Sequence, residues 1–187
     1  HHTTLTGFKW IARAPGLGFG YEEAIGFCPD PAHVRDKDGI ATSVVAASLV
    51  AALKAQGCSV WDELERLARL HGLHVSSPLT FRVEQIEQIA SGMARLRAQP
   101  PSVLAGSPVV EVSDLSQGYR GLPPTDGVLV LTEAGDRVIA RPSGTEPKLK
   151  CYLEVILPVA EGEPLPWEQA RERLDAIKGA FAEIIGL

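Results

Sequence analysis

The stretch Val128-Leu129-Val130-Leu131-Thr132-Glu133-Ala134-Gly135-Asp136-Arg137-Val138-Ile139-Ala140 decides the fold of the second half of the chain. Both of its ends are rich in β-branched and apolar residues, which favour extended strands. Residues 133–136, between these ends, include a glycine and an aspartate, and both are typical of turns. The sequence therefore predicts two strands joined by a short turn, and with them an antiparallel sheet.

Further strands and two helices are predicted around this hairpin. Residues 109–112 and 150–155 are strand-like, being β-branched or alternating in character. Residues 84–98 place apolar side chains on one helical face and end before Pro100, which cannot continue a helix. A last amphipathic helix follows Pro166. We therefore expect the second half to be an α+β domain with a small antiparallel sheet covered by helices.

The first half combines a glycine-rich loop with helices. Residues 15–20 contain three glycines, which a regular helix does not accommodate, and predict a loop between strands. One helix is expected from about Asp38 to Gly57, and a second from a capping pattern at Ser59 to about Gly72. We expect these helices to lie beside a partial, mixed sheet in an α/β domain.

The chain is long enough for two small domains. It has 187 residues, of which 45% are hydrophobic and 22% charged, and such a composition can bury one or two ordinary cores. Residues 74–82 are extended in character and are predicted to link the domains. We therefore expect a first domain over residues 1–76 and a second over residues 77–187.

Charge and cysteine content argue against several classes of protein. The net charge of -5 argues against nucleic-acid binding, which needs a basic face. The longest apolar run, residues 44–53, is interrupted by serine and too short to span a bilayer, so no membrane partner is expected. The three cysteines show neither a disulfide framework nor metal-ligand spacing. We expect no metal bound to this chain and a reducing, cytoplasmic location.

The loop after the central hairpin collects groups that suit a phosphate dianion. Its sequence is RPSGTEPKLK, residues 141–150. The arginine can bind two phosphate oxygens with its planar guanidinium, the hydroxyls add neutral donors, and the glycine allows backbone N–H groups to approach closely. A polar turn with solvated basic residues has the same composition, so both interpretations stay open here. The candidate phosphate-binding residues are Arg141, Ser143, Gly144, Thr145 and Lys150.

A second polar loop, residues 20–27, carries two carboxylates between glycines. Glu22 and Glu23 are good acceptors for paired sugar hydroxyls. Adjacent glutamates are, however, more often a solvated surface feature, because successive side chains point in different directions. The residues alone therefore leave a sugar-binding role as one alternative.

Both loops resemble those of one enzyme family. The sequence RPSGTEPKLK resembles the phosphate-binding loop in the last domain of the α-D-phosphohexomutases, the phosphoglucomutase/phosphomannomutase family. Residues 20–27 resemble the sugar-binding loop of the same family, which implies that Glu22 contacts sugar hydroxyls and that Glu23 belongs to the same loop. Many hexose members have serine where this chain has Ala24, and this form looks more like the branch that includes phosphopentomutases as well as hexose mutases.

Two shorter segments extend the resemblance. Thr6 and Gly7 look like the pair that lines the family's cleft, and they are assigned to sugar binding on that basis. Lys37 lies in a stretch similar to one whose lysine faces the phosphate, so it joins the phosphate-binding candidates. A lysine at a helix N-terminus opposes the helix dipole, which favours a functional reason for its presence there.

The resemblance covers only the third and fourth domains of the family and implies that the chain is a C-terminal fragment. The full-length enzyme is expected to interconvert sugar 1-phosphate and sugar 6-phosphate through a phosphoserine and a bisphosphate intermediate. Its partners are expected to be sugar phosphates, sugar bisphosphate and the N-terminal domains of the same chain. No Ser-His-Asn-Pro or Asp-x-Asp-x-Asp motif occurs here. We therefore expect Mg²⁺ only in a missing domain, no catalytic residue in this fragment, and no activity by the fragment alone.

Three other interpretations are open. The full protein could be a phosphopentomutase of the same superfamily. The chain could also be a free-standing, non-catalytic sugar-phosphate binding module, although a natural module should begin with a complete strand-helix unit. Finally, it could be a structural domain whose loops match by coincidence, in which case replacing Arg141 would leave ligand affinity unchanged.

Overall fold

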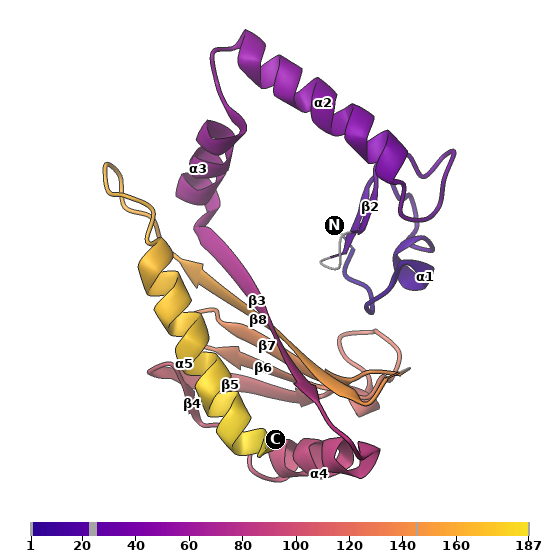
Figure 1. The fold of residues 1–187 in the computed structure, drawn as a ribbon, viewed down its shortest axis with the longest axis vertical. Coiled ribbons are helices and arrows are strands. Elements are labelled where there is room, and N and C mark those ends of the chain that lie inside the picture. Colours follow the sequence, from indigo (N-terminus) through magenta and orange to yellow (C-terminus); the bar gives the residue numbers. More distant parts are fainter. Residues whose placement is uncertain (1, 23–25, 145, 187) are drawn as a thin grey trace. The chain divides into compact units, whose positions relative to one another are not determined.

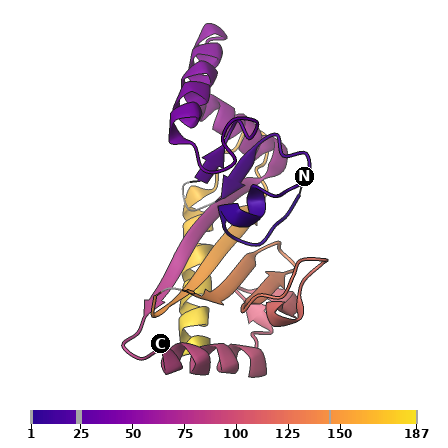
Figure 2. The same ribbon diagram turned by 90° about the vertical axis from the view of Figure 1, so that its right-hand side faces the viewer.

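The structure is a computed structural model that describes residues 2–22, 26–144 and 146–186. Its elements are drawn in Figures 1 and 2. The chain divides into two compact units, His1–Leu64 and Glu65–Leu187. Each unit has its own sheet. The predicted fold class, an α/β part followed by an α+β part, is confirmed.

The first unit is built around a short antiparallel hairpin. Strand β1 (Gly20–Glu22) pairs with β2 (Gly26–Cys28), and a helical turn, α1 (Phe8–Ile11), packs beside them. Phe8, Ile11 and Cys28 form its small buried cluster. The sheet is expected to be mixed, but its two described strands are antiparallel, because they are consecutive in the chain and only three residues separate them.

Two helices follow the hairpin, as predicted. Helix α2 (Gly39–Ala55) begins at Asp38, whose carboxylate accepts hydrogen bonds from the N–H groups of Ile40 and Ala41 at 3.0 and 2.9 Å. Such a cap satisfies donors that a helix start leaves unpaired. Helix α3 (Val60–His71) starts at the predicted capping pattern, in which the Ser59 N–H donates to Asp62 at 2.7 Å.

No single described helix is long and apolar enough to cross a membrane. Helices α2 and α3 meet the requirements of length and apolarity only as a pair, and they are bent by 88° relative to each other.

The second unit contains a six-stranded antiparallel sheet with two helices on one face. The strand order is β3-β8-β7-β6-β5-β4, and every neighbouring pair is antiparallel. Helices α4 and α5 both contact this sheet and each other. The elements are β3 (Leu73–Arg82), α4 (Ile86–Ala98), β4 (Val103–Leu104), β5 (Ser107–Asp114), the 3-10 turn η1 (Leu115–Gln117), β6 (Val128–Thr132), β7 (Arg137–Pro142), β8 (Lys148–Leu157) and α5 (Trp167–Ile185).

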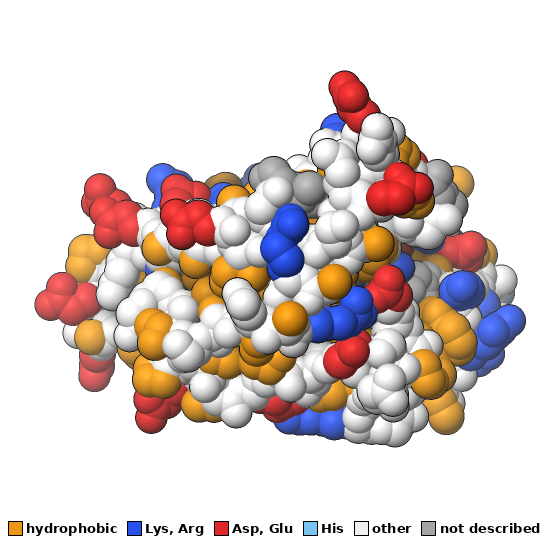
Figure 3. All heavy atoms as spheres, turned by 90° about the horizontal axis from the view of Figure 1, so that it is seen from below, with side chains coloured by type: hydrophobic (Ala, Val, Ile, Leu, Met, Phe, Trp, Pro, Cys, Tyr) orange, Lys and Arg blue, Asp and Glu red, His pale blue; other side chains and the backbone are white. Residues whose placement is uncertain are grey.

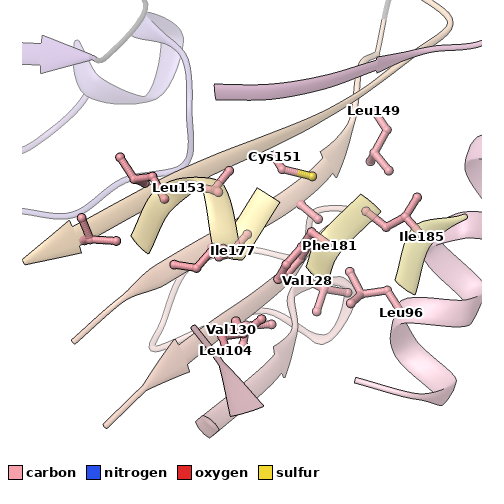
Figure 4. Close-up of a cluster of buried hydrophobic side chains, with 14 of the residues drawn as sticks. Leu96, Leu104, Val128, Val130, Leu149, Cys151, Leu153, Ile177, Phe181 and Ile185 are labelled. Carbon is pink, nitrogen blue, oxygen red and sulfur yellow. The ribbon is translucent and has the colours of Figure 1, made fainter. Parts of the chain in front are cut away.

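The core lies between the sheet and its helices. Side chains along β8 alternate strictly, and those at odd positions from Leu149 to Leu157 are buried. They meet the buried face of α5, which includes Ile177 and Phe181, both 0% exposed. Figure 4 shows these side chains converging with residues of β6, β4 and α4. The helices therefore occupy one face of the sheet, and the other face carries charged side chains such as Arg137 and Glu154 beside apolar ones such as Leu129 and Ile139.

The expected linker at residues 74–82 is in fact part of this sheet. Strand β3 pairs with β8 from Leu73 opposite Leu157 to Arg82 opposite Lys148. The prediction of extended structure is correct, but the prediction of a linker is wrong, because the pairing partner lies far along the chain. Residues 76 and 77, between which we placed the domain boundary, both lie in β3. The boundary itself stays a prediction.

Candidate functional site

The predicted phosphate loop connects β7 to β8, and its basic residues lie on the sheet face opposite the helices. Arg141 on β7 is directly opposite Lys150 on β8, and Lys150 is directly opposite Thr80 on β3. Ala140 and Leu149, the residues that precede Arg141 and Lys150, are 0% exposed and face the core. Since successive side chains on a strand point to opposite faces, Arg141 and Lys150 project from the face opposite the helices. The structure therefore places these two cations side by side.

Backbone hydrogen bonds give the loop a defined shape. The N–H of Ser143 donates to the Lys148 carbonyl at 2.8 Å, and the N–H of Lys148 donates to the Glu146 carbonyl at 2.7 Å. Gly144 is exposed, and a Cβ there would meet no atom within 4 Å. The space beside the loop backbone is thus open at this glycine. Thr145, the remaining candidate of the loop, lies outside the described residues.

The charges of the loop are unevenly paired. Lys148 Nζ lies 2.6 Å from Glu146 Oε1, and this hydrogen bond and charge lower the pKa of Glu146. Arg82 and Lys150 lower the same pKa by smaller contributions. Neither Arg141 nor Lys150 forms an ion pair within the described parts of the chain. Cations without a partner carboxylate are available to an anionic ligand.

In the first unit, the structure brings Glu22 and Lys37 together. Lys37 Nζ lies 3.6 Å from Glu22 Oε1 and 4.6 Å from the centre of the Phe8 ring. The Glu22 side chain is only 14% exposed. A partly buried carboxylate beside an ammonium group is held in one position, so it can accept hydrogen bonds from a hydroxyl-bearing ligand with little reordering.

Gly26 is needed for this arrangement. A Cβ at this position would lie 2.5 Å from Glu22 Cγ and 2.7 Å from a carbon of the Phe8 ring. Both distances are shorter than van der Waals contact allows, so only glycine lets the hairpin, the carboxylate and the ring approach each other. Gly26, one of the glycines that flank the two glutamates in the sequence, thus has a packing reason.

Thr6 and Gly7 lead into this cluster. Gly7 precedes α1 with φ 110, a backbone conformation that favours glycine, and its carbonyl accepts a hydrogen bond from the Trp10 N–H at 2.9 Å. Thr6 is exposed. Gly7 directly precedes Phe8, which contacts Lys37. Glu23, the second candidate carboxylate, lies outside the described residues. The assignment of all these residues to sugar or phosphate remains a prediction.

Two neighbours of the candidate residues, one in each unit, are not identified from the sequence. Phe8 lies beneath Lys37, and Arg82 ends β3 opposite Lys148. Phe8 directly follows the candidate pair Thr6 and Gly7, so its position in the sequence is a signal by which it could be found. Nothing in the sequence pointed to Arg82, because its place depends on the register between two strands distant in the chain.

The described residues do not suit a metal ion. Within residues 2–22, 26–144 and 146–186, no three His, Cys, Asp or Glu side chains are grouped so that they could hold one. Figure 3 shows one face of the molecule, on which acidic and basic side chains are interspersed with apolar ones. This face is therefore not a continuous basic surface.

Comparisons with known proteins agree on one family. Residues 1–69 match the family model described as "Phosphoglucomutase/phosphomannomutase, alpha/beta/alpha domain III". Residues 81–165 match "Phosphoglucomutase/phosphomannomutase, C-terminal domain". The two models, both of the same family, together cover more than half of the chain.

Three similar proteins are named as a phosphomannomutase, a phosphopentomutase and a phosphoglucomutase. A probable phosphomannomutase of Haemophilus influenzae is 43% identical over 81% of this chain and 30% of its own length. A phosphopentomutase of Mus musculus is 30% identical over 96% of this chain and 32% of its own length. A phosphoglucomutase of Staphylococcus aureus is 31% identical over 82% of this chain and 31% of its own length. The chain thus spans about a third of the length of these relatives.

A solved structure shares the fold. The open form of the phosphoglucomutase pp63/parafusin from Paramecium superposes with a TM-score of 0.59 and 18% sequence identity. The match covers 91% of this chain and 31% of that protein. At this level of identity the likeness concerns the fold alone.

Proposed function

Because the chain belongs to the phosphoglucomutase/phosphomannomutase family, we propose that it carries the substrate-recognition loops of a sugar-phosphate mutase. Such an enzyme is an isomerase, since it moves a phosphoryl group between two positions of one sugar. The observation that carries the proposal is the pairing of Arg141 with Lys150 across β7 and β8, with no carboxylate of the described residues bound to either. The substrates are sugar phosphates and a sugar bisphosphate.

In the proposed reaction, a phosphoserine donates its phosphoryl group to the free hydroxyl of a sugar monophosphate. For a hexose, the two positions are the 1- and the 6-position. The sugar bisphosphate then turns round and returns its other phosphoryl group to the serine, so that phosphate is conserved in each cycle. We assign the serine, and the Mg²⁺ that assists phosphoryl transfer, to other parts of the longer protein.

The residues of this chain bind and orient. The guanidinium of Arg141 and the ammonium of Lys150 hold the phosphate that is not being transferred, with Ser143 and the loop N–H groups as further donors. Glu22, kept in place by Lys37 and Gly26, accepts hydrogen bonds from sugar hydroxyls. Positioning of this kind supplies much of the rate in phosphoryl transfer, because the attacking and leaving oxygens must be held in line.

Calorimetric titration with glucose 1,6-bisphosphate tests the proposal. The wild-type chain should bind this bisphosphate. Arg141→Ala should lose most of the affinity, because it removes the bidentate contact of the guanidinium with the phosphate. Arg137→Ala is the matched control, since Arg137 lies on the same strand but already pairs with Glu154 at 2.8 Å. Equal affinities of wild type and Arg141→Ala would contradict the proposal.

A pentose is the second candidate substrate. The mouse phosphopentomutase aligns over 96% of this chain, more than the 81% of the phosphomannomutase, although its identity is lower. Ala24, which led to the same alternative from the sequence, lies outside the described residues. Parallel titrations with ribose 1,5-bisphosphate and glucose 1,6-bisphosphate separate the two, and the tighter ligand identifies the sugar class.

A further inference from the structure

We propose that Arg82 is an additional phosphate-binding residue, which reaches the loop of residues 141–150 from the edge strand β3. The inference rests on the proposed function, because it assumes that this loop receives a phosphate. It adds to the site a residue that lies some sixty positions away in the chain, outside the loop sequence.

The register of three strands places Arg82 at the loop. Arg82 is opposite Lys148, and two residues earlier Thr80 is opposite Lys150, which is itself opposite Arg141. Neighbouring strands are about 4.8 Å apart, and two residues along a strand span about 6.7 Å. An arginine side chain is long enough to cross such a distance. The guanidinium of Arg82 can therefore contact the same ligand as Lys150 and Arg141.

Arg82 projects from the same face as the other cations. Along β3, Val75, Leu79 and Phe81 pack against the core between the sheet and the helices. The alternate positions, Thr80 and Arg82, are exposed. They therefore share the face opposite the helices with Lys148 and Lys150 on β8, and Leu149, between these two lysines, is buried.

Charge pairing distinguishes the loop end from the rest of this face. Further along the same face, Arg137 Nη2 lies 2.8 Å from Glu154 Oε2. At the loop end, Lys148 pairs with Glu146. Arg82, Lys150 and Arg141 form no ion pair with a carboxylate of the described residues, although the whole chain has a net charge of -5.

Three neighbouring cations that form no ion pair with a described carboxylate repel one another, and an anionic ligand relieves that repulsion. Arg82 is close enough to the loop for its charge to lower the pKa of Glu146. A phosphate monoester carries a charge of about -2 at neutral pH and has three acceptor oxygens, which suits donors that converge from three strands. The chemical class of ligand for Arg82 is therefore a phosphate monoester dianion.

The test compares three variants by calorimetric titration with glucose 1,6-bisphosphate at low and moderate salt. Arg82→Gln should lower the affinity about tenfold and weaken its salt dependence, because one charge-assisted contact is lost. Arg82→Lys should keep most of the affinity. Arg137→Gln, on the same face but paired with Glu154, should bind like the wild type. Arg82 is exposed, so circular dichroism should show an unchanged fold in each case.

The outcomes separate this inference from the proposed function. Wild-type affinity in Arg82→Gln, together with loss of binding in Arg141→Ala, would overturn the role of Arg82 and leave the proposed function standing. Wild-type affinity in both variants, or no binding by the wild-type chain, would overturn both. An equal loss in Arg137→Gln would show that the effect is nonspecific electrostatics and would also overturn the role of Arg82.

Discussion

Asp136 and Arg173 form a bidentate ion pair, in which Nε and Nη2 of the arginine each lie 2.7 Å from a carboxylate oxygen. Asp136 is 0% exposed and ends the turn between β6 and β7, and Arg173 lies on α5. Thr132 completes the cluster, since its hydroxyl donates to Asp136 at 2.8 Å. The pair therefore links helix α5 to the hairpin formed by β6 and β7.

Breaking this pair should destabilise the second unit. Asp136→Ala leaves the guanidinium without its buried partner, and such a loss costs about 3 kcal/mol or more of unfolding free energy. Urea unfolding measures the change. Asp175→Ala is the control on the same helix, because Asp175 is 72% exposed and its pair with Lys178 should contribute less than about 1 kcal/mol. Equal effects in the two variants would show that burial of the pair does not matter.

The core should depend on Phe181. Its ring is 0% exposed between α5 and the sheet, so Phe181→Ala leaves a cavity and should cost about 3–5 kcal/mol. Trp167 starts the same helix and is 44% exposed. Trp167→Ala should therefore cost clearly less in the same thermal or urea unfolding experiment. A smaller loss for Phe181→Ala than for Trp167→Ala would contradict the placement of the core.

Gly26 should control the position of Glu22. In Gly26→Ala, the new Cβ would overlap Glu22 Cγ and the Phe8 ring, so the carboxylate must move. If Glu22 binds sugar hydroxyls, affinity for glucose 1,6-bisphosphate should fall about tenfold, the loss expected for a charge-assisted hydrogen bond. Gly18→Ala, just before the hairpin, is the control, because its Cβ would meet no atom within 4 Å. Unchanged affinity in Gly26→Ala would argue against Glu22 as a sugar ligand.

The three cysteines should differ in reactivity. Cys28 and Cys151 are buried, and burial raises the pKa of both thiols, that of Cys151 to about 12. The thiolate is the reactive form, so the folded chain should react with a maleimide at pH 8 through the exposed Cys58 alone. Mass spectrometry counts the modified sites, and unfolding in urea should expose the other two. Rapid labelling of Cys151 in the folded chain would contradict its burial.

The same thiol predicts a loss of stability in alkaline solution. Its pKa is 9.0 in the unfolded chain and about 12 in the folded one, so its stabilising contribution is complete below pH 9.0 and is lost as the pH rises through about 12. Unfolding free energies measured from pH 8 to 11 should therefore fall less steeply in Cys151→Ala than in the wild type. Equal slopes would mean that Cys151 ionises in the folded state.

Local patterns in the sequence predicted most of the elements. The strands at residues 109–112, 128–131, 137–140 and 150–155 and the helices beside them form where periodicity placed them. Their apolar faces repeat at the period of a strand or a helix, and that information lies within a few neighbouring residues. The two candidate loops were likewise visible as local clusters of polar groups between glycines and strands.

What the sequence by itself determined was therefore the family, the class of fold and the two loops, because each of these is written in residues close together in the chain. Only the tertiary structure showed that residues 73–82 form an edge strand, that Lys37 contacts Glu22 and Phe8, and that Arg82 lies beside the loop of residues 141–150. These contacts follow from cross-strand register and from packing between segments distant in sequence. A shift of one residue in that register would turn Arg82 to the opposite face, and no local pattern fixes it.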